Sequence, residues 1–259
     1  MTSRRRRPSA LAGVDGCRAG WIAAVETCDG SASFLVAAHF HDILAALPND
    51  ALLAVDMPIG LPDRIVGGGR VAEMAGRARL TGPRRSSIFP IPARSAVEAG
   101  AGPFATAEDR GAAYRESCRL ARAASDPPRA PSIQSFGLFP RIMELDGLLR
   151  ANASLAARVF ESHPELAFAG LNGGSPLRYP KKRHGARCAE GEAERRTLLR
   201  RADLPPALLG ERPKGAGEDD RLDACVLLLV ARRLREGQAV SYPDPPGCDA
   251  HGLPVTIWV

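Results

Sequence analysis

The chain has 259 residues, of which 45% are hydrophobic and 25% are charged. This is the balance of an ordinary globular protein, and no run approaches the roughly 18 apolar residues that a membrane-spanning helix needs. The formal net charge is +6, and subtracting the four arginines of residues 4–7 leaves +2. Charge alone therefore does not identify nucleic acid as a partner.

The first ten residues, MTSRRRRPSA, contain four arginines with no apolar segment behind them. A secretory signal requires such a segment, so we expect residues 1–10 to be a disordered basic tail and the protein to be cytoplasmic. The six cysteines include no CxxC pair. This spacing predicts reduced thiols and argues against disulfides and thiolate zinc sites.

Three short strands are predicted at residues 11–16, 20–26 and 31–40, and glycines and the turn sequence CDGS between them favour a meander. A short helix is expected at 41–50. The nearly all-apolar segment at 51–60 is typical of a strand that is covered on both faces, and it contains Asp56.

The composition changes after this strand. From about residue 61 to 155, a glycine-rich loop and a proline-rich segment alternate with arginine-rich segments that are predicted to be helical. We interpret them as a helical cap inserted into a single α/β domain at 11–259. Residues 157–171 predict a further strand. The strongest helix signal is at 217–237, with acids in its first turn and arginines in its last, and 252–259 predicts an edge strand.

Four acids could converge if the first strand is central and the fourth strand lies parallel beside it. These are Asp15 and Asp56 near strand ends, with Asp220 and Asp223 on one helix face. Converging carboxylates repel one another unless cations neutralise them, and oxygen ligands suit Mg²⁺ or Mn²⁺. The alternatives are turn roles for Asp15 and Asp56, an N-cap role for Asp219, and helix-dipole roles for Asp220 and Asp223.

Six motifs resemble, in their order along the chain, an uncharacterised family of predicted nucleases, the domain of unknown function 429 family. They are GVDGCRAGW, AVDMPIGLP, RRSSIFPIPAR, RIMELDG, ESHPELAFAGLNG and DDRLDA. The resemblance implies an RNase H-like fold and a metal-dependent phosphodiesterase site with Asp15, Asp56, Asp220 and Asp223 as ligands. One departure is Glu73, where the family motif after the fourth strand has an aspartate.

Further candidates lie outside this acid set. Glu161, His163 and Glu165 would point to one face of a strand, where they could act in acid/base work or metal binding, or form a hydrogen-bonded structural group. Basic and hydroxyl side chains could contact a phosphate backbone or form a solvated surface; they are Arg18, Arg84, Arg85, Ser86, Ser87, Arg94, Lys181, Lys182, Arg183 and Arg187.

The sequence thus favours a magnesium- or manganese-dependent nuclease or phosphodiesterase that acts on nucleic acid or a nucleotide phosphodiester, without a membrane partner. Two alternatives stay open. An actin-like or sugar-kinase-like phosphotransferase would also place an Asp-Gly turn after its first strand, although a second phosphate-binding glycine turn is missing. A nucleic-acid-binding protein without turnover would bind tightly whether or not a chelator is present.

Overall fold

The structure, a computed structural model, describes residues 7–183 and 186–259. The predicted basic tail at 1–10 lies largely outside these residues. Within its described part, Ser9 donates hydrogen bonds from N and Oγ to Asp50, and Ala10 begins the first strand. The described chain forms two compact units. The first contains the residues up to Asp56, Arg158–Val240 and Trp258–Val259, and the second contains Met57–Ala157 and Ser241–Ile257.

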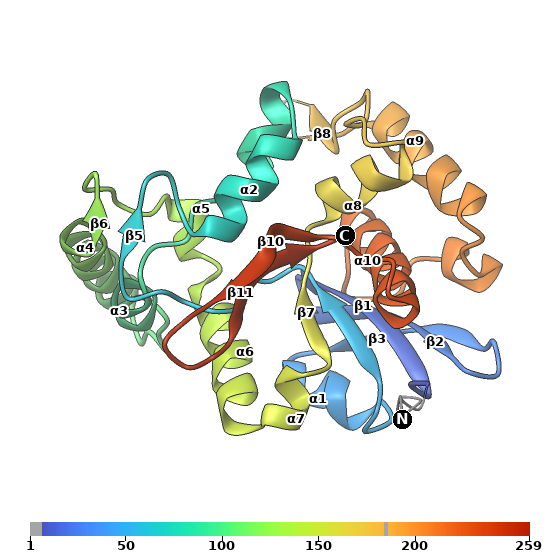
Figure 1. The fold of residues 1–259 in the computed structure, drawn as a ribbon, viewed down its shortest axis with the longest axis horizontal. Coiled ribbons are helices and arrows are strands. Elements are labelled where there is room, and N and C mark those ends of the chain that lie inside the picture. Colours follow the sequence, from blue (N-terminus) through green and yellow to red (C-terminus); the bar gives the residue numbers. More distant parts are fainter. Residues whose placement is uncertain (1–6, 184–185) are drawn as a thin grey trace. The chain divides into compact units, whose positions relative to one another are not determined.

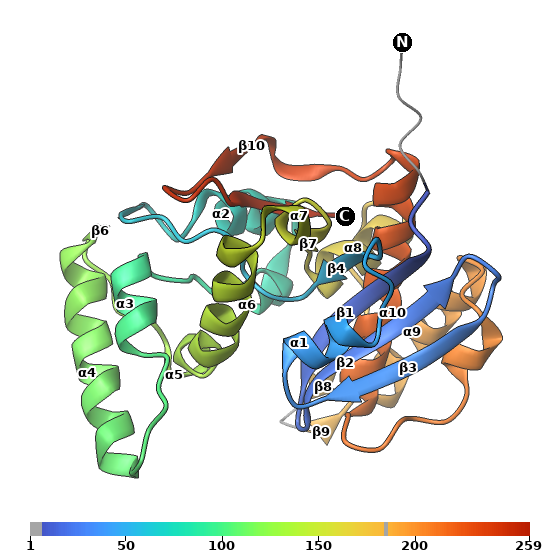
Figure 2. The same cartoon turned by 90° about the horizontal axis from the view of Figure 1, so that it is seen from below.

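The first unit is built on a five-stranded mixed sheet (Figures 1 and 2). Its strands, in spatial order, are β3 (Ala32–Ala37), β2 (Gly20–Thr27), β1 (Ala10–Cys17), β4 (Leu52–Val55) and β7 (Val159–Glu161). The first three are antiparallel neighbours, and β1, β4 and β7 are parallel. The predicted meander followed by parallel strands is confirmed.

Helices cover both faces of this sheet. On one face are α8 (Pro164–Leu171), α9 (Ala189–Arg201) and α10 (Glu218–Glu236), which share a hydrophobic core with Leu11, Ile22 and Ala54 of the sheet. On the other face, α1 (Phe40–Ala45) packs Phe40 edge-on against Trp21. The remaining elements are a hairpin of β8 (Lys182–Arg183) and β9 (Ala186–Arg187) and the 3-10 helix η2 (Pro206–Leu209).

The second unit is mainly helical and contains the region predicted as an inserted cap. Its helices are α2 (Val71–Arg79), α3 (Arg94–Ala99), α4 (Ala107–Ala123), α5 (Ile133–Phe136), α6 (Phe139–Ala151), α7 (Ala153–Ala156) and the 3-10 helix η1 (Gly82–Ser87). Two small sheets pair β5 (Ile65–Val66) with β6 (Ser125–Asp126) and β10 (Ser241–Cys248) with β11 (Pro254–Trp258). The predicted C-terminal strand therefore pairs chiefly with β10, and only Trp258 bridges to Ser162 beside β7.

The predicted strand at 157–171 is wrong beyond Glu161. The chain leaves β7 there and begins α8 at Pro164. Proline has no N–H for a strand ladder, whereas its fixed φ angle suits the first position of a helix. Glu161, His163 and Glu165 consequently do not share one strand face.

In the described residues, no helix combines the length and apolarity that crossing a membrane requires. No disulfide joins any of the six cysteines, all of which lie in the described residues.

Candidate metal centre

The sheet register brings two aspartates together. The parallel pairing of β1 and β4 ends at Val14 and Val55, and Asp56 N donates to Val14 O at 2.9 Å. One residue further along, Asp15 and Asp56 lie side by side, and because side chains alternate along a strand they point to the face opposite that of Val14 and Val55. Asp15 lies inside β1, two residues before its end, so it is not the turn residue of the hairpin.

The third aspartate comes from α10, which lies unusually close to β1. A side chain at Gly13 would place its Cβ 2.0 Å from Leu228 N and 2.1 Å from Ala224 O, so only glycine allows this approach. Gly13 and Asp15 share a strand face, which directs the Asp15 carboxylate towards the start of α10. Asp223, in the second turn of that helix, completes the group.

Each of Asp15, Asp56 and Asp223 offers a carboxylate oxygen, and these oxygens lie within 4.8 Å of one another. Asp15 and Asp223 are buried, with 8% and 2% of their surface exposed, and Asp56 is partly buried. Burial raises the pKa of Asp15 well above its usual value, and the charges of Asp56 and Asp223 raise it further. Burial also raises the pKa of Asp56 to about 7 and that of Asp223 to about 6.

Lys181 supplies the nearby positive charge. Its Nζ donates to Asp223 Oδ2, and its side chain is 31% exposed. Burial by itself would lower the pKa of Lys181, but the charges of Asp223 and Asp15 raise it above its usual range. With every group ionised, three carboxylates and one ammonium leave a charge of −2.

A fully buried oxygen of this group has no hydrogen-bond partner among the described residues. Asp15 Oδ1 accepts from Gly16 N at 2.7 Å and Asp223 Oδ2 accepts from Lys181, but Asp223 Oδ1 is buried and receives no hydrogen bond from the described residues. A buried carboxylate oxygen without a donor carries a large desolvation cost. The donor set, the net charge and this oxygen all fit a divalent cation.

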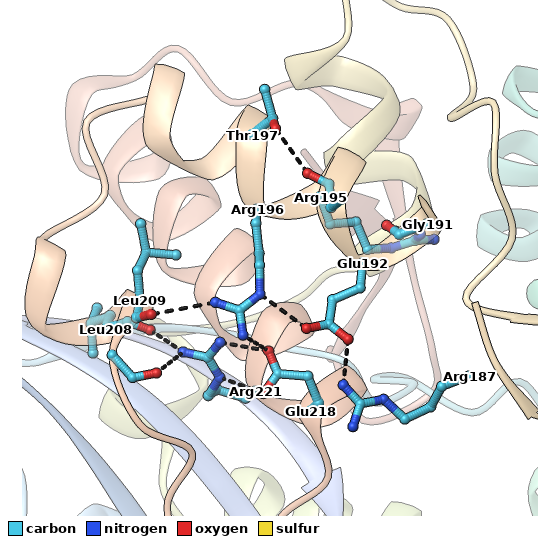
Figure 3. A network of polar contacts seen from close by, with 12 residues as sticks. Arg187, Gly191, Glu192, Arg195, Arg196, Thr197, Leu208, Leu209, Glu218 and Arg221 are labelled. Carbon is cyan, nitrogen blue, oxygen red and sulfur yellow. Dashed lines mark hydrogen bonds and ion pairs between the residues drawn. The ribbon is translucent and has the colours of Figure 1, made fainter. Parts of the chain in front are cut away.

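A group of matched charges fixes the start of α10 (Figure 3). Arg221 donates from Nε and Nη2 to Glu218 and from Nη1 to Leu208 O at 2.6 Å, and Arg196 of α9 donates to the same carboxylate at 2.6 Å. Arg221 is fully buried. These bonds hold the first turn of α10 in place and thereby position Asp223.

The other two acids of this turn have different roles. Asp220 Oδ2 accepts from Gly217 N at 2.8 Å and so caps the helix. Asp219 pairs with Lys182 at 3.0 Å, and Gly217, not Asp219, is the N-cap residue. Asp220 was expected among the ligands, but the group of three oxygens does not include it, although its charge still raises the pKa of Asp15.

The three residues of the ESHPE segment separate. Glu161 pairs in register with Val55 and therefore faces away from Asp56. His163 precedes α8. Glu165, in the first turn of α8, binds Arg195 of α9 as a buried ion pair, yet it is close enough to raise the pKa of Asp56. No local pattern indicated that Arg195 pairs with Glu165, because the two residues lie 30 positions apart.

Comparison with protein families finds a match over residues 13–247 to a family described as proteins of unknown function, DUF429. The chain belongs to this family. No curated protein and no solved structure matches the chain.

The basic and hydroxyl residues of this DUF429 protein that were predicted to contact a phosphate backbone lie in both units. Arg18 is exposed in the turn between β1 and β2, and the cations around β8 and β9 are partly paired, Lys182 with Asp219 and Arg187 with Glu192. In the second unit, η1 contains Arg84, Arg85, Ser86 and Ser87.

Arg94 of the second unit is not available to a phosphate in the way the sequence suggested. It is buried, binds both oxygens of Asp146 at 2.8 and 2.9 Å, and donates to Asp249 at 3.0 Å. Its position in a proline-laced, basic segment resembled a binding loop, and its carboxylate partners lie 52 and 155 residues away. The motif RRSSIFPIPAR therefore contributes at least one residue to packing.

Proposed function

We propose that Asp15, Asp56 and Asp223 bind Mg²⁺ or Mn²⁺ and that the protein is a metal-dependent phosphodiesterase of RNase H-like fold, acting on nucleic acid or a nucleotide. The observation that supports this most is the buried Asp223 Oδ1, which has no donor in the described chain while it belongs to a cluster of three carboxylates. The three-strand meander followed by parallel strands is the arrangement that the family resemblance implies.

The spacing of the oxygens suits a small divalent ion after a modest contraction. The cluster oxygens lie within 4.8 Å of one another. Oxygens that share one Mg²⁺ at about 2.1 Å would lie about 3.0 Å apart as neighbours and about 4.2 Å apart as opposite ligands, so binding would draw together any pair that is wider. A divalent ion would also neutralise the charge of −2 that remains after Lys181 is counted.

The chain's own residues then have distinct tasks. The three aspartates hold the ion, and Glu218 with Arg221 keeps Asp223 in place. Asp223 Oδ1 can act as a ligand while Lys181 stays on Oδ2, and the Lys181 ammonium beside the ion would then be available to a phosphate oxygen. When bound, the cation would polarise the phosphate and lower the pKa of a bound water.

The test is cleavage of single- and double-stranded DNA, RNA and bis(p-nitrophenyl) phosphate by the purified protein with Mn²⁺ or Mg²⁺. Loss of activity in Asp223→Asn, with retention in Glu236→Gln, is the expected result. Glu236 lies at the other end of the same helix and is exposed, so it controls for general effects on α10.

Calorimetric titration with Mn²⁺ separates binding from turnover. Binding that Asp223→Asn abolishes, without cleavage of any substrate, would keep the metal centre and overturn the phosphodiesterase. Absence of Mn²⁺ binding by the wild-type protein would overturn both.

A further inference from the structure

The second unit contains a pocket that the proposed metal centre does not use. It has a volume of about 290 Å³ and lies between the Gly67–Gly69 loop, the end of α4 and two proline-rich segments. The volume is far above the roughly 10–15 Å³ that one water needs, and it is close to the lower end for small-molecule sites, about 300 Å³. We call it the loop pocket.

The walls of the loop pocket are mostly apolar. Ile65, Ile91 and Ala121 are buried side chains, and the prolines Pro90, Pro92 and Pro131 form further parts of the wall. Such rigid apolar walls are typical of sites that enclose the body of a small ligand, where a few polar groups then fix its orientation.

Arg129 is the charged residue of this lining. Its backbone N–H is bound to Ser125 Oγ at 2.8 Å, which anchors the residue at the end of β6. Within the part of the chain that the structure describes, no hydrogen bond or ion pair occupies the Arg129 guanidinium. It contrasts in this respect with Arg70 and Arg94 of the same unit, which bind carboxylates.

A second arginine stands behind the glycine loop. Arg77 Nη2 donates to Gly68 O at 2.7 Å, and a Cβ at Gly69 would lie only 2.8 Å from the same nitrogen. Gly69 has a φ of +149°. The loop thus needs glycine at this position for its backbone conformation, and the Arg77 side chain packs closely against it.

Positive charge exceeds negative charge around this loop. Burial lowers the pKa of Arg77, and the charges of Arg129 and Arg85 lower it further, whereas Glu73 opposes them. Glu73 is already engaged by Arg70, through Nε at 2.7 Å and the backbone N at 2.6 Å. An oxyanion beside Arg129 would therefore meet an uncompensated positive field.

We propose that the loop pocket binds a small organic oxyanion, with its charged group beside Arg129 and its apolar body against the proline-lined wall. A neutral apolar ligand would leave the guanidinium without a partner. An inorganic anion would leave the apolar walls unfilled. The excess of arginines favours a phosphate monoester, which carries more charge, over a carboxylate.

Calorimetric titration with phenyl phosphate, benzoate, inorganic phosphate and benzyl alcohol tests this proposal. The buffer is freed of metal with a resin, because a soluble chelator is itself an anion. Phenyl phosphate should bind most tightly and benzoate next, and both should bind at least tenfold more tightly than inorganic phosphate or benzyl alcohol.

Two variants locate the binding. Arg129→Met, which keeps the apolar stem, should weaken phenyl phosphate about tenfold and leave benzyl alcohol unchanged. Ala130→Trp should weaken both, because Ala130 lines the pocket and the larger side chain fills it. Arg122→Met is the matched control, since Arg122 is an exposed arginine of α4 that does not line the pocket.

Arg129 and Ala130 are exposed, so both variants should fold. The proposal is overturned if phenyl phosphate shows no saturable binding at millimolar concentration. Binding that Arg129→Met and Ala130→Trp leave unchanged would overturn it equally. Neither result would bear on the metal centre, whose residues belong to the first unit.

Discussion

Two groups of buried aspartates behave in opposite ways. In the second unit, Asp249 accepts from Arg94, from the backbone N–H groups of His251 and Leu253 through one oxygen and from that of Leu61 through the other, and these bonds lower its pKa although burial opposes them. In the first unit, burial raises the pKa of Asp56 and Asp223 because their donors are too few. A buried carboxylate with a full set of donors stays ionised, whereas one without them holds its proton more tightly unless a cation neutralises it.

The largest effect should come from breaking the ion-pair group of Arg94, Asp146 and Asp249 in the second unit. Arg94→Met leaves Asp146 and Asp249 without their main cation, and we expect a loss of about 3–5 kcal/mol in the free energy of unfolding. Urea denaturation measures it. Arg150→Met is the control: Arg150 contacts the same Asp146 at 3.3 Å but is 38% exposed, so its loss should cost less than about 1 kcal/mol. Equal losses in the two variants would contradict the structural role of Arg94.

Removing a charge from the group of Asp15, Asp56 and Asp223 should instead raise the free energy of unfolding. The pKa of Asp56 is about 7 in the folded chain and about 3.9 in an unfolded one. The folded state therefore loses stability as the pH rises from about 4 to about 7, and the loss is complete above that range. Asp56→Asn should stabilise the metal-free protein by on the order of 4 kcal/mol at pH 8 and by only about 1.5 kcal/mol at pH 5.

Denaturation at both pH values in metal-free buffer tests this, with Asp249→Asn as the contrasting variant. The pKa of Asp249 is lowered, so its charge contributes stability that is present above its unfolded pKa, and the amide should destabilise the protein at pH 8. A destabilising Asp56→Asn at pH 8 would show that Asp56 has donors that compensate its burial.

These opposite environments limit what the sequence could predict. Turn residues predicted the meander, a nearly all-apolar run predicted β4, and helical spacing of apolar residues predicted α10, because all of these signals are local. Asp15, Asp56 and Asp223 were singled out because each lies near the end of a strongly patterned element. The number of hydrogen-bond donors around a carboxylate cannot be predicted from the nearby sequence. The donors to Asp249 come from residues as far away as Leu61, and nothing near Arg94 in the chain indicates Asp249 as its partner.

Two further differences between prediction and structure arise where elements begin or end, and a third arises from tertiary contacts. Pro164 ended the ESHPE strand and separated Glu161 from Glu165, although the period-two pattern continued through both. Asp219 resembled an N-cap by residue type, but Gly217 is the N-cap residue and Asp220 accepts its N–H from within the helix. Lys181 was noted as a phosphate contact, and its bond to Asp223 depends on tertiary structure across 42 residues.

Lys181 provides a sharper test of the group formed by Asp15, Asp56 and Asp223, because its ammonium already binds the carboxylate of Asp223. Lys181→Met should tighten Mn²⁺ binding about tenfold, since the cation no longer competes with an ammonium for Asp223. Calorimetric titration measures the affinity. Lys182→Met is the control, because Lys182 is 57% exposed and pairs with Asp219 outside the group of three oxygens. Weaker Mn²⁺ binding by Lys181→Met would mean that Lys181 holds Asp223 in position.

The smallest effect is expected at Asp220, and it decides whether three aspartates or four bind the ion. As a helix cap, Asp220 stabilises the first turn of α10 through Gly217 N, so Asp220→Ala should cost about 1 kcal/mol in the free energy of unfolding. Mn²⁺ affinity should stay nearly unchanged, because the Asp220 carboxylate oxygen is already bonded to the backbone. Asp220→Asn, whose amide oxygen can accept the same hydrogen bond, should recover most of the stability. If both variants instead lose Mn²⁺ binding while the Asn variant stays as stable as the wild type, Asp220 is a fourth ligand and its capping bond yields to the ion.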